Sequence, residues 1–365
     1  MSKDLHEYAS IPLKQQSNRV WRTYTGGALI DRWKKEAAEQ DGSFPEEWIM
    51  STIAARGKGR PENEGLSIVH TPEGDLPLKE LIAADPSLFL GKEHVKTYDS
   101  AGVLIKMLDS CERLTIQVHP DKKYAREILG SEFGKTESWY ILGGREIDGE
   151  KSAVYMGFKK GVTKDIWKDL FQRQDIAGML NCLHRFEVQP GDAFMVYGGV
   201  PHAIGAGCFL LEVQEPTDYT MRVEKTTPGG LTISDELIHQ GVGEEKMLDC
   251  FHYEGCTFEE AEKNWKITPQ VIDSSPDHQL KSIFNETHTD CFAVNELTLH
   301  GEYSIKGNRR FFVAVIYSGE GTLYCNEKIT AFSQGDEIFF SAAIDEITFT
   351  AKKTARVLFC YPPLI

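Results

Sequence analysis

The sequence predicts a mainly β protein made of two jelly-roll β-barrel modules with a small helical insertion. Short apolar runs separated by Gly-rich corners recur along the chain, which is typical of antiparallel strands. One turn-and-strand pattern occurs twice, as PGDAF at 190–194 and as QGDEI at 334–338. The chain has 365 residues, more than one ordinary core accommodates. Together these observations favour two β-rich modules.

The first part of the chain alternates predicted strands with short helices. Apolar residues at helical spacing between 29 and 37 predict a short helix that ends near 41–42, and PEEWIM at 45–50 predicts an entering strand. Residues 101–119 predict two successive strands, because the apolar pattern there has a period of two. Pro120 opens a predicted short helix that Gly130 closes.

A strand, a helical insertion and a strand pair follow. The aromatic-rich segment TESWYIL at 136–142 predicts a strand. Residues 163–184 predict the helical insertion, because a capping threonine precedes an apolar stripe at helical spacing. Apolar runs at 193–196 and 208–211 predict the two strands of a hairpin, with the Gly-rich corner 198–201 between them.

The rest of the chain predicts a second module. A helical segment is expected near 229–250, and from about 257 onward we expect mostly short strands with Gly turns. We therefore divide the chain into a catalytic barrel over 1–250 and a C-terminal barrel over 251–365. The second barrel is expected to hold no metal, because residues 301–365 contain no histidine.

Composition limits the partners and the compartment. The formal net charge of −15 argues against binding to nucleic acid or to an anionic membrane surface. None of the eight cysteines forms a C-x-x-C pair and several lie in apolar runs, which favours a reducing, cytoplasmic location. No apolar secretion signal is visible at the N-terminus. Residues 193–211 lack charge, but their four glycines and one proline argue against a membrane span.

Four side chains predict a metal site in the first barrel. Gln117 and His119 are two residues apart on an alternating strand and so share a face. Glu137 lies on the next predicted strand, and His202 lies just past the Gly-rich corner. Two imidazoles and a carboxylate suit a divalent metal, zinc above all, with iron or manganese as alternatives. Each residue alone is more often structural, so the prediction depends on all four facing one interior.

Three cations accompany these residues. Lys106 alternates with apolar neighbours, Lys135 lies two residues before Glu137, and Arg222 follows the predicted hairpin. Either they are solvated charges at strand ends, or they converge at the mouth of the barrel. In the second case they would attract a phosphorylated metabolite despite the acidic composition of the chain.

The motifs resemble those of type I phosphomannose isomerase, a zinc-dependent cupin enzyme with cupin/jelly-roll modules. The resemblance covers residues 45–223. Its blocks are the early E-W block at 45–51, TIQVHPDK at 115–122, KTE at 135–137 and GGVPHA at 198–203, followed by Glu212 and Arg222 ten residues apart. The chain departs from the family where PTDYTM at 216–221 replaces the usual S-D-N block.

The resemblance implies a metal-dependent aldose–ketose isomerase that interconverts mannose 6-phosphate and fructose 6-phosphate by moving a proton between C1 and C2. It implies that Gln117, His119, Glu137 and His202 bind Zn²⁺. We expect Arg222, Lys135 and Glu212 to be catalytic, with Glu212 as the acid and base at carbon. Lys106, Thr115 and Arg222 are expected to contact the substrate.

Two other functions fit the same residues. One is a cupin oxygenase with iron on two histidines and one carboxylate, although its pocket is expected to be drier than one with facing cations. The other is a non-catalytic sugar-phosphate-binding cupin that has kept the barrel and lost turnover. The sequence does not predict the oligomeric state.

Overall fold

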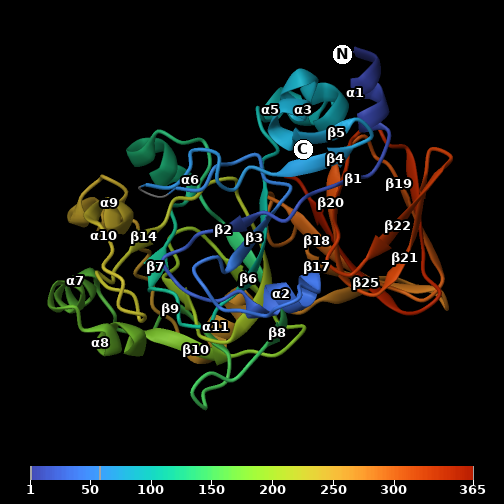
Figure 1. Cartoon of the computed structure of the whole chain (residues 1–365). Helices are drawn as coiled ribbons and strands as arrows, with labels where there is room; N and C mark the ends of the chain where they lie inside the picture. Colours follow the sequence, from blue (N-terminus) through green and yellow to red (C-terminus); the bar gives the residue numbers. More distant parts are fainter. Residues whose placement is uncertain (1, 57–58, 365) are drawn as a thin grey trace.

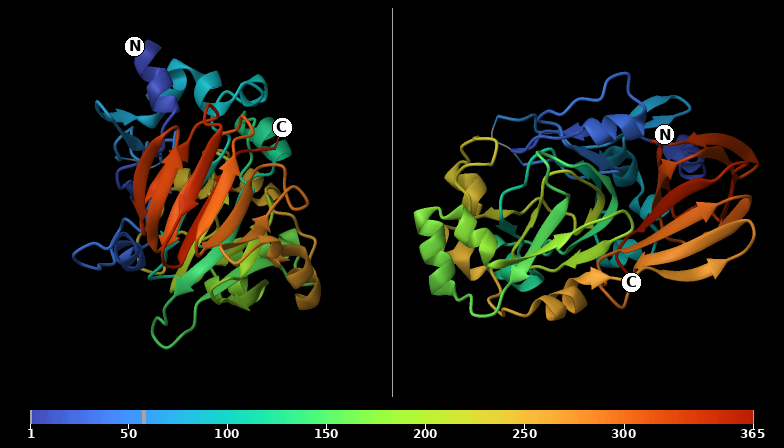
Figure 2. Two further views of the ribbon diagram at one scale, coloured as in Figure 1. Left: turned by 90° about the vertical axis from the view of Figure 1, so that its right-hand side faces the viewer. Right: turned by 90° about the horizontal axis from the view of Figure 1, so that it is seen from below.

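The computed structural model describes residues 2–56 and 59–364, and two β-barrels lie side by side in it (Figures 1 and 2). The first barrel is formed by a seven-stranded sheet that faces a five-stranded sheet. The larger sheet has the order β15 (Lys266–Ile267), β11 (Ala193–Val196), β8 (Glu137–Gly144), β13 (Cys208–Gln214), β6 (Leu104–Asp109), β3 (Glu46–Ile49) and β2 (Arg19–Val20). The smaller sheet has the order β10 (Leu183–Glu187), β9 (Ala153–Phe158), β12 (His202–Ile204), β7 (Gln117–Val118) and β14 (Met221–Arg222).

The second barrel repeats this plan with a seven-stranded and a four-stranded sheet. Its larger sheet has the order β1 (Leu13–Lys14), β23 (Glu337–Phe340), β20 (Phe312–Ser318), β25 (Ala355–Tyr361), β18 (Ala293–Leu299), β17 (His278–Phe284) and β16 (Gln270–Ser274). Its smaller sheet has the order β19 (Glu302–Lys306), β24 (Glu346–Thr350), β21 (Glu320–Cys325) and β22 (Lys328–Ser333). A separate hairpin joins β4 (Ile68–Thr71) to β5 (Gly74–Pro77).

Short helices surround the barrels. They are α1 (Ser2–Ala9), α2 (Ala28–Lys34), α3 (Leu78–Ala84), α4 (Pro86–Leu90), α5 (His94–Thr97), α6 (Lys122–Tyr124) with the π-helical turn η1 (Ala125–Leu129), α7 (Lys164–Arg173), α8 (Ile176–Asn181), α9 (Asp235–His239), α10 (Glu244–Asp249) and α11 (Phe258–Trp265). Helices α7 to α10 lie at the end of the first barrel that is remote from the second (Figure 2). Within the described residues, every helix is too short or too polar to traverse a bilayer.

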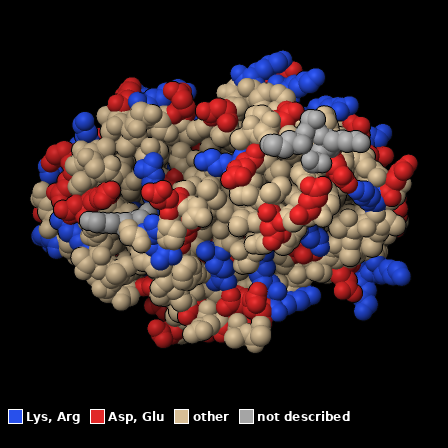
Figure 3. Space-filling view, turned by 45° about the horizontal axis from the view of Figure 1, so that its top comes forward, with Lys and Arg blue, Asp and Glu red and all other residues tan. Residues whose placement is uncertain are grey.

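The two large sheets pack back to back and form the main core between the barrels. On β8, Tyr140 and Leu142 point into this core, whereas Trp139 and Ile141 point into the first barrel. This alternation follows from the period of two along a strand. On the face shown in Figure 3, Lys and Arg side chains lie among Asp and Glu side chains rather than in a patch of one sign.

The predicted fold class is confirmed, and so is the helical segment near 229–250, which holds α9 and α10. The prediction of a single helical insertion over 163–184 is wrong in detail, because two helices lie there. Gln174 takes a left-handed backbone conformation and ends α7, and the Asp175 side chain then caps α8. The apolar stripe does not continue through Leu183, which begins strand β10.

The predicted hairpin is also wrong. The runs at 193–196 and 208–211 lie in β11 and β13, which both pair with β8 and not with each other. Residues between them cross to the smaller sheet, where His202 begins β12 and pairs with Gln117. Local alternation predicts which way a side chain points but does not identify the partner strand, and that is why the hairpin was expected.

The expectation of mostly strands after residue 257 missed helix α11. Thr257 and Glu260 form a reciprocal capping box at its start, which is a signal that the sequence contains. Ala261 and Trp265 of this helix pack into the core of the first barrel, and β15 then pairs with β11. The domain division at residue 250 stays a prediction.

The repeated Gly-Asp pattern forms equivalent corners in both barrels. Asp192 accepts a hydrogen bond from the Gln189 N–H at 3.0 Å, and Asp336 accepts one from the Ser333 N–H at 2.8 Å. Each aspartate also forms an ion pair with the lysine of a two-residue edge strand, Lys266 of β15 at 2.9 Å or Lys14 of β1 at 2.7 Å. The repeat therefore reflects the duplicated barrel plan.

The junction between the barrels contains two buried carboxyl groups and one lysine. Lys34 Nζ lies 2.9 Å from Glu337 Oε2 and 3.5 Å from Glu47 Oε1. Gln15 Nε2 also donates to Glu337 Oε2 at 2.6 Å. Burial raises the pKa of Glu337 to about 8, and the neighbouring Glu47 contributes to this shift.

This raised pKa predicts that stability falls as the pH rises. Between the ordinary pKa of 4.5 and about 8, the folded chain holds a proton that the unfolded chain has released, so the free energy of unfolding decreases through that window. We expect Glu337→Gln to reduce the decrease by an amount on the order of 2 kcal/mol, as measured by urea unfolding across the pH range. Glu346→Gln, at an exposed glutamate of the same barrel, is the control. An unchanged slope in Glu337→Gln would contradict the assignment.

Candidate active site

A row of four facing residues crosses the large sheet of the first barrel and points inward. Lys106 of β6 lies opposite Trp48 of β3 and opposite Glu212 of β13, and Glu212 lies opposite Trp139 of β8. Lys106 Nζ lies 2.8 Å from Glu212 Oε1 and 5.2 Å from the centre of the Trp48 ring. Trp139 Nε1 donates to Glu212 Oε2 at 3.2 Å. The row fixes both charged side chains inside the barrel.

The facing sheet supplies a second row. Gln117 of β7 pairs with His202 of β12 and with Arg222 of β14. The two rows meet where the His202 ring stands edge-on to Trp139, with ring centres 5.5 Å apart. His119 follows β7 and contacts His202. The predicted sharing of a face by Gln117, His119, Glu137 and His202 therefore corresponds to one cluster in the structure.

Three of the predicted ligands converge on one point. The ligand atoms of His119, Glu137 and His202 all lie within 4.8 Å of one another, and all three residues are buried. His119 Nε2 lies 3.1 Å from Glu137 Oε2 and 3.2 Å from His202 Nε2. Glu137 Oε1 lies 3.5 Å from His202 Nε2.

Hydrogen bonds on the far side of each ring fix the tautomers. His119 Nδ1 lies 2.9 Å from the Tyr219 carbonyl oxygen, and His202 Nδ1 lies 2.8 Å from that of Val200. Each Nδ1 therefore carries the proton and each Nε2 offers a lone pair to the cluster. Burial lowers the pKa of His202 and, with Lys135 nearby, lowers the pKa of His119 to about 3, so both rings are neutral at physiological pH.

The cluster fits a cation. Although burial opposes ionisation, the Lys135 ammonium holds the pKa of Glu137 well below its ordinary value, so it is a carboxylate. Neither of its oxygens makes a hydrogen bond within the described part of the chain. Two imidazole lone pairs and a carboxylate within 3.1–3.5 Å repel one another unless a positive charge lies among them. This donor set is the one that borderline divalent metals bind.

Gln117 lies beside the cluster, but its amide nitrogen, not its amide oxygen, faces His202. Its Nε2 lies 3.2 Å from His202 Nε2 and so donates to that ring. Rotating the amide by half a turn would present the carbonyl oxygen instead. The ligand role of Gln117 therefore stays a prediction that depends on this rotation.

Lys135 is the cation nearest to the cluster. Its Nζ lies 3.0 Å from His119 Nε2 and 3.3 Å from Glu137 Oε2. The ammonium thus contacts the same lone pairs that a metal would use. Since its side chain is buried, Lys135 remains beside any ligand bound at the cluster.

Alternating charges continue away from the cluster through residues that the sequence analysis did not select. Arg22 lies 2.8 Å from Glu46 Oε2 and 3.3 Å from Asp218 Oδ2, and Lys106 lies 3.7 Å from Glu46 Oε2. Despite burial, Arg22 and Lys106 hold the pKa of Glu46 well below its ordinary value. Burial, together with Glu137, raises the pKa of Glu212.

Signals for these missed residues were uneven. Glu46 shares a strand face with Trp48, and an acid on a buried strand indicates an inward charge. Asp218 lies in the segment that departs from the family pattern. Arg22 lies just after the two-residue strand β2, which is too short to produce a periodic pattern.

Arg222 lies at the wall of the same pocket. Its Nη1 donates to the Leu237 carbonyl at 2.8 Å and to the Thr220 carbonyl at 3.2 Å. Burial lowers its pKa to about 10, so it remains cationic at neutral pH. Within the described residues, its Nε and Nη2 make no hydrogen bond and are available to a ligand.

The pocket has a narrow inner part and a wide outer part. The inner cavity has a volume of about 40 Å³, and its walls include Thr115, Gln117, Lys135, Glu212 and Arg222. An adjoining hollow of about 710 Å³ shares four wall residues with it: Arg22, Thr23, Tyr24 and Thr227. Every residue predicted to touch substrate or metal thus lies at or beside this cavity.

Comparisons with known proteins find similarity to mannose-6-phosphate isomerases. The family model described as "Mannose-6-phosphate isomerase, cupin domain" matches residues 282–360. The mannose-6-phosphate isomerase ManA of Bacillus subtilis (strain 168) is 29% identical over 256 residues, which is 68% of this chain and 71% of that protein. A mannose-6-phosphate isomerase of Streptococcus mutans is 35% identical over 148 residues, or 40% of this chain and 43% of that protein.

A solved structure shows the same fold. The crystal structure of the mannose 6-phosphate isomerase from Bacillus subtilis superposes with a TM-score of 0.73 at 23% identity, and covers 96% of this chain and 99% of that one. The fold, the sequence relatives and the matched C-terminal barrel agree with one another. The chain is therefore similar in sequence to mannose-6-phosphate isomerases, its C-terminal barrel matches their cupin-domain model, and it shares the fold of a solved member.

Proposed function

We propose that the chain interconverts mannose 6-phosphate and fructose 6-phosphate by moving a proton between C1 and C2. The observation that carries this proposal is the convergence of His119, Glu137 and His202 beside a pocket that also holds Lys135, Glu212 and Arg222. The isomerases named above support this function over an oxygenase or a non-catalytic binder. A sugar phosphate also suits the cations in the pocket wall, which an oxygenase does not require.

The proposed metal is Zn²⁺, held by His119, Glu137 and His202, with Gln117 as a fourth ligand after rotation of its amide. Two imidazoles and one carboxylate form a common catalytic zinc set, which leaves coordination positions for substrate. When bound there, a divalent metal acts as a Lewis acid that polarises a substrate oxygen.

The side chains around the cluster supply the remaining chemistry. Glu212 is the proposed acid and base at carbon, because its raised pKa brings it closer to neutrality. Lys106 and Trp139 hold its two oxygens and so fix the direction of its lone pairs. Lys135 donates to the substrate oxygens as negative charge develops on them.

We propose that Arg222 contacts the phosphate group of the substrate. Arg222 keeps NH groups available, and a guanidinium binds phosphate with paired hydrogen bonds. Lys106 as a phosphate contact stays a prediction, because two carboxylates already engage it. Since the inner cavity holds only about 40 Å³, a hexose 6-phosphate must displace its wall residues and extend into the outer hollow.

Metal removal tests the proposal. We expect a chelator to abolish isomerisation of mannose 6-phosphate, and Zn²⁺ to restore it with about one equivalent bound per chain. Metal analysis and a coupled assay for fructose 6-phosphate measure the two effects together. Full turnover in a metal-free sample would refute the role of the cluster, and bound metal without turnover would favour the non-catalytic binder.

A further inference from the structure

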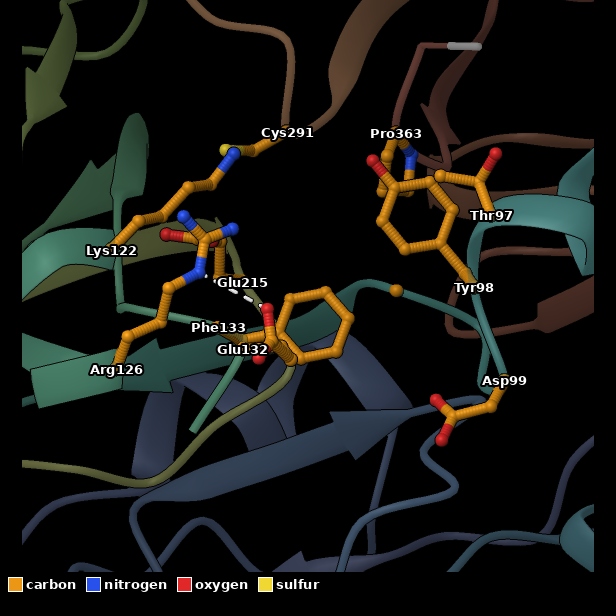
Figure 4. A pocket seen from close by; sticks show the side chains of 11 residues that line it. Thr97, Tyr98, Asp99, Lys122, Arg126, Glu132, Phe133, Glu215, Cys291 and Pro363 are labelled. Carbon is orange, nitrogen blue, oxygen red and sulfur yellow. Dashed lines mark hydrogen bonds and ion pairs between the residues drawn. The ribbon is translucent and has the colours of Figure 1, made fainter. Parts of the chain in front are cut away.

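A second cavity lies between the barrels, on the far side of residues 134–137 from the cluster. Its volume is about 450 Å³, within the range of small-molecule sites. The first barrel supplies most of the wall and the second barrel completes it. The lining residues are Thr97, Tyr98, Asp99, Gly102, Lys122, Arg126, Glu132, Phe133, Glu215, Cys291 and Pro363 (Figure 4).

Glu215 is the unusual member of this set. The residue is only 1% exposed, and its Oε1 makes no hydrogen bond with any described residue. Its Oε2 accepts from the Thr136 N–H at 2.9 Å, and its own N–H donates to the Thr136 carbonyl at 3.0 Å. One oxygen thus fixes the side chain while the other lacks a donor, which is costly in a buried carboxyl group.

Two cations lie on the same side of the cavity as Glu215 (Figure 4). Lys122 Nζ lies 3.3 Å from Asp290 Oδ1, and Arg126 Nε lies 3.0 Å from Glu132 Oε2. Lys122 forms no ion pair with Glu215, and burial raises the pKa of that carboxyl group although Lys122 opposes the shift. Both cations therefore retain N–H groups that can donate to a ligand.

Aromatic rings form another part of the wall. Tyr98 and Phe133 stack on each other with ring centres 6.0 Å apart, and both side chains are partly exposed at the cavity. Their exposed parts add an apolar surface to the cavity wall. The cavity thus combines an apolar wall with separated donors and acceptors.

The charges select against an ionic ligand. The lining has two cations, Lys122 and Arg126, and three carboxyl groups, on Asp99, Glu132 and Glu215. A phosphate would face the carboxylates, and a cation would face the lysine and the arginine. A hydroxyl group can accept from an ammonium and donate to a carboxylate at the same time.

We propose that this cavity binds a neutral, hexose-sized sugar, whose hydroxyl groups hydrogen-bond to the Glu215 carboxyl group, the Lys122 ammonium and the Arg126 guanidinium while its less polar face packs against Phe133 and Tyr98. The site is separate from the catalytic pocket, because the two share no lining residue. It therefore does not depend on the proposed isomerase activity.

Calorimetric titration with unphosphorylated D-mannose and D-fructose tests the proposal. We expect at least one of them to bind to the full chain, and to bind equally well in saturating mannose 6-phosphate. Glu215→Gln and Arg126→Ala should each weaken this binding by about tenfold or more. Arg126→Ala also covers the case in which Glu215→Gln fails to fold, because the Arg126 side chain is 57% exposed.

Arg173→Ala is the matched control, since this arginine is also 57% exposed and paired with a surface acid but lies on α7, away from the cavity. It should leave sugar binding unchanged. The proposal is overturned if neither sugar binds, if both cavity variants bind like the parent chain, or if mannose 6-phosphate displaces the neutral sugar. Isomerase activity of Arg126→Ala, measured in parallel, reports separately on the catalytic pocket.

Discussion

Replacing His202 by alanine is expected to remove the bound metal and to lower kcat/KM by about three orders of magnitude or more. His202 Nε2 lies within 3.5 Å of His119 Nε2 and Glu137 Oε1, so its loss leaves only these two strong donors beside Gln117. Metal analysis of the purified variant and the isomerase assay measure the two losses. Because His202 is the first residue of β12 and packs on Trp139, a modest loss of stability should accompany them.

His184→Ala is the matched control for this experiment. His184 is also buried in the first barrel, but its Nε2 lies 3.1 Å from the Cys256 carbonyl and away from the cluster. It should lose stability while keeping both metal and kcat. Equal metal content in His202→Ala and in the parent chain would show that the cluster is not the metal centre.

Lys106→Met is expected to lower the free energy of unfolding by about 3–5 kcal/mol. Lys106 is only 3% exposed and lies between Glu212 and Glu46, so removing its charge leaves two carboxyl groups in the barrel with fewer partners. Denaturant unfolding of the purified variant measures this loss.

A double variant separates the lost ion pair from lost packing. Lys106→Met combined with Glu212→Met removes both charges and should recover part of the stability, because apolar groups of similar volume then face each other. Lys151→Met, at a lysine whose side chain is 68% exposed and 3.9 Å from Glu187, should change stability by less than about 0.5 kcal/mol. A loss of that small size in Lys106→Met would show that the row of charges is not a stabilising element.

The alternation of side chains between the two faces of a strand accounts for much of what the sequence predicted. The spacing of Gln117 and His119 fixed a shared face before any partner strand was known, and Gln117 indeed lies opposite His202. The alternation of side chains could not show that β12 belongs to the facing sheet, because the choice of sheet depends on which strands pair over long distances in the sequence. For this reason the prediction of a hairpin was wrong, although His202 does point into the barrel as expected.

Residues outside regular strands were hardest to predict. Arg22 and Asp218 lie in irregular segments, and their roles come from an ion pair across 196 positions of the chain. Glu215 gives no sequence signal either, because the missing hydrogen bond of its Oε1 can be recognised only in the folded structure, where both barrels line the cavity. Local sequence patterns predict helices and strands, whereas these contacts form only when segments that are far apart in the sequence pack together.

Strand β3 connects the two interiors of the molecule through consecutive residues. Glu46 turns toward Arg22 and Lys106, whereas Glu47 turns toward Lys34 at the contact with the second barrel. One peptide unit joins them, so the two carboxylates lie on opposite faces of the same strand. The C-terminal barrel has no histidine after residue 300, but its Glu337 shares Lys34 with Glu47, which is the residue next to the Glu46 carboxylate of the pocket.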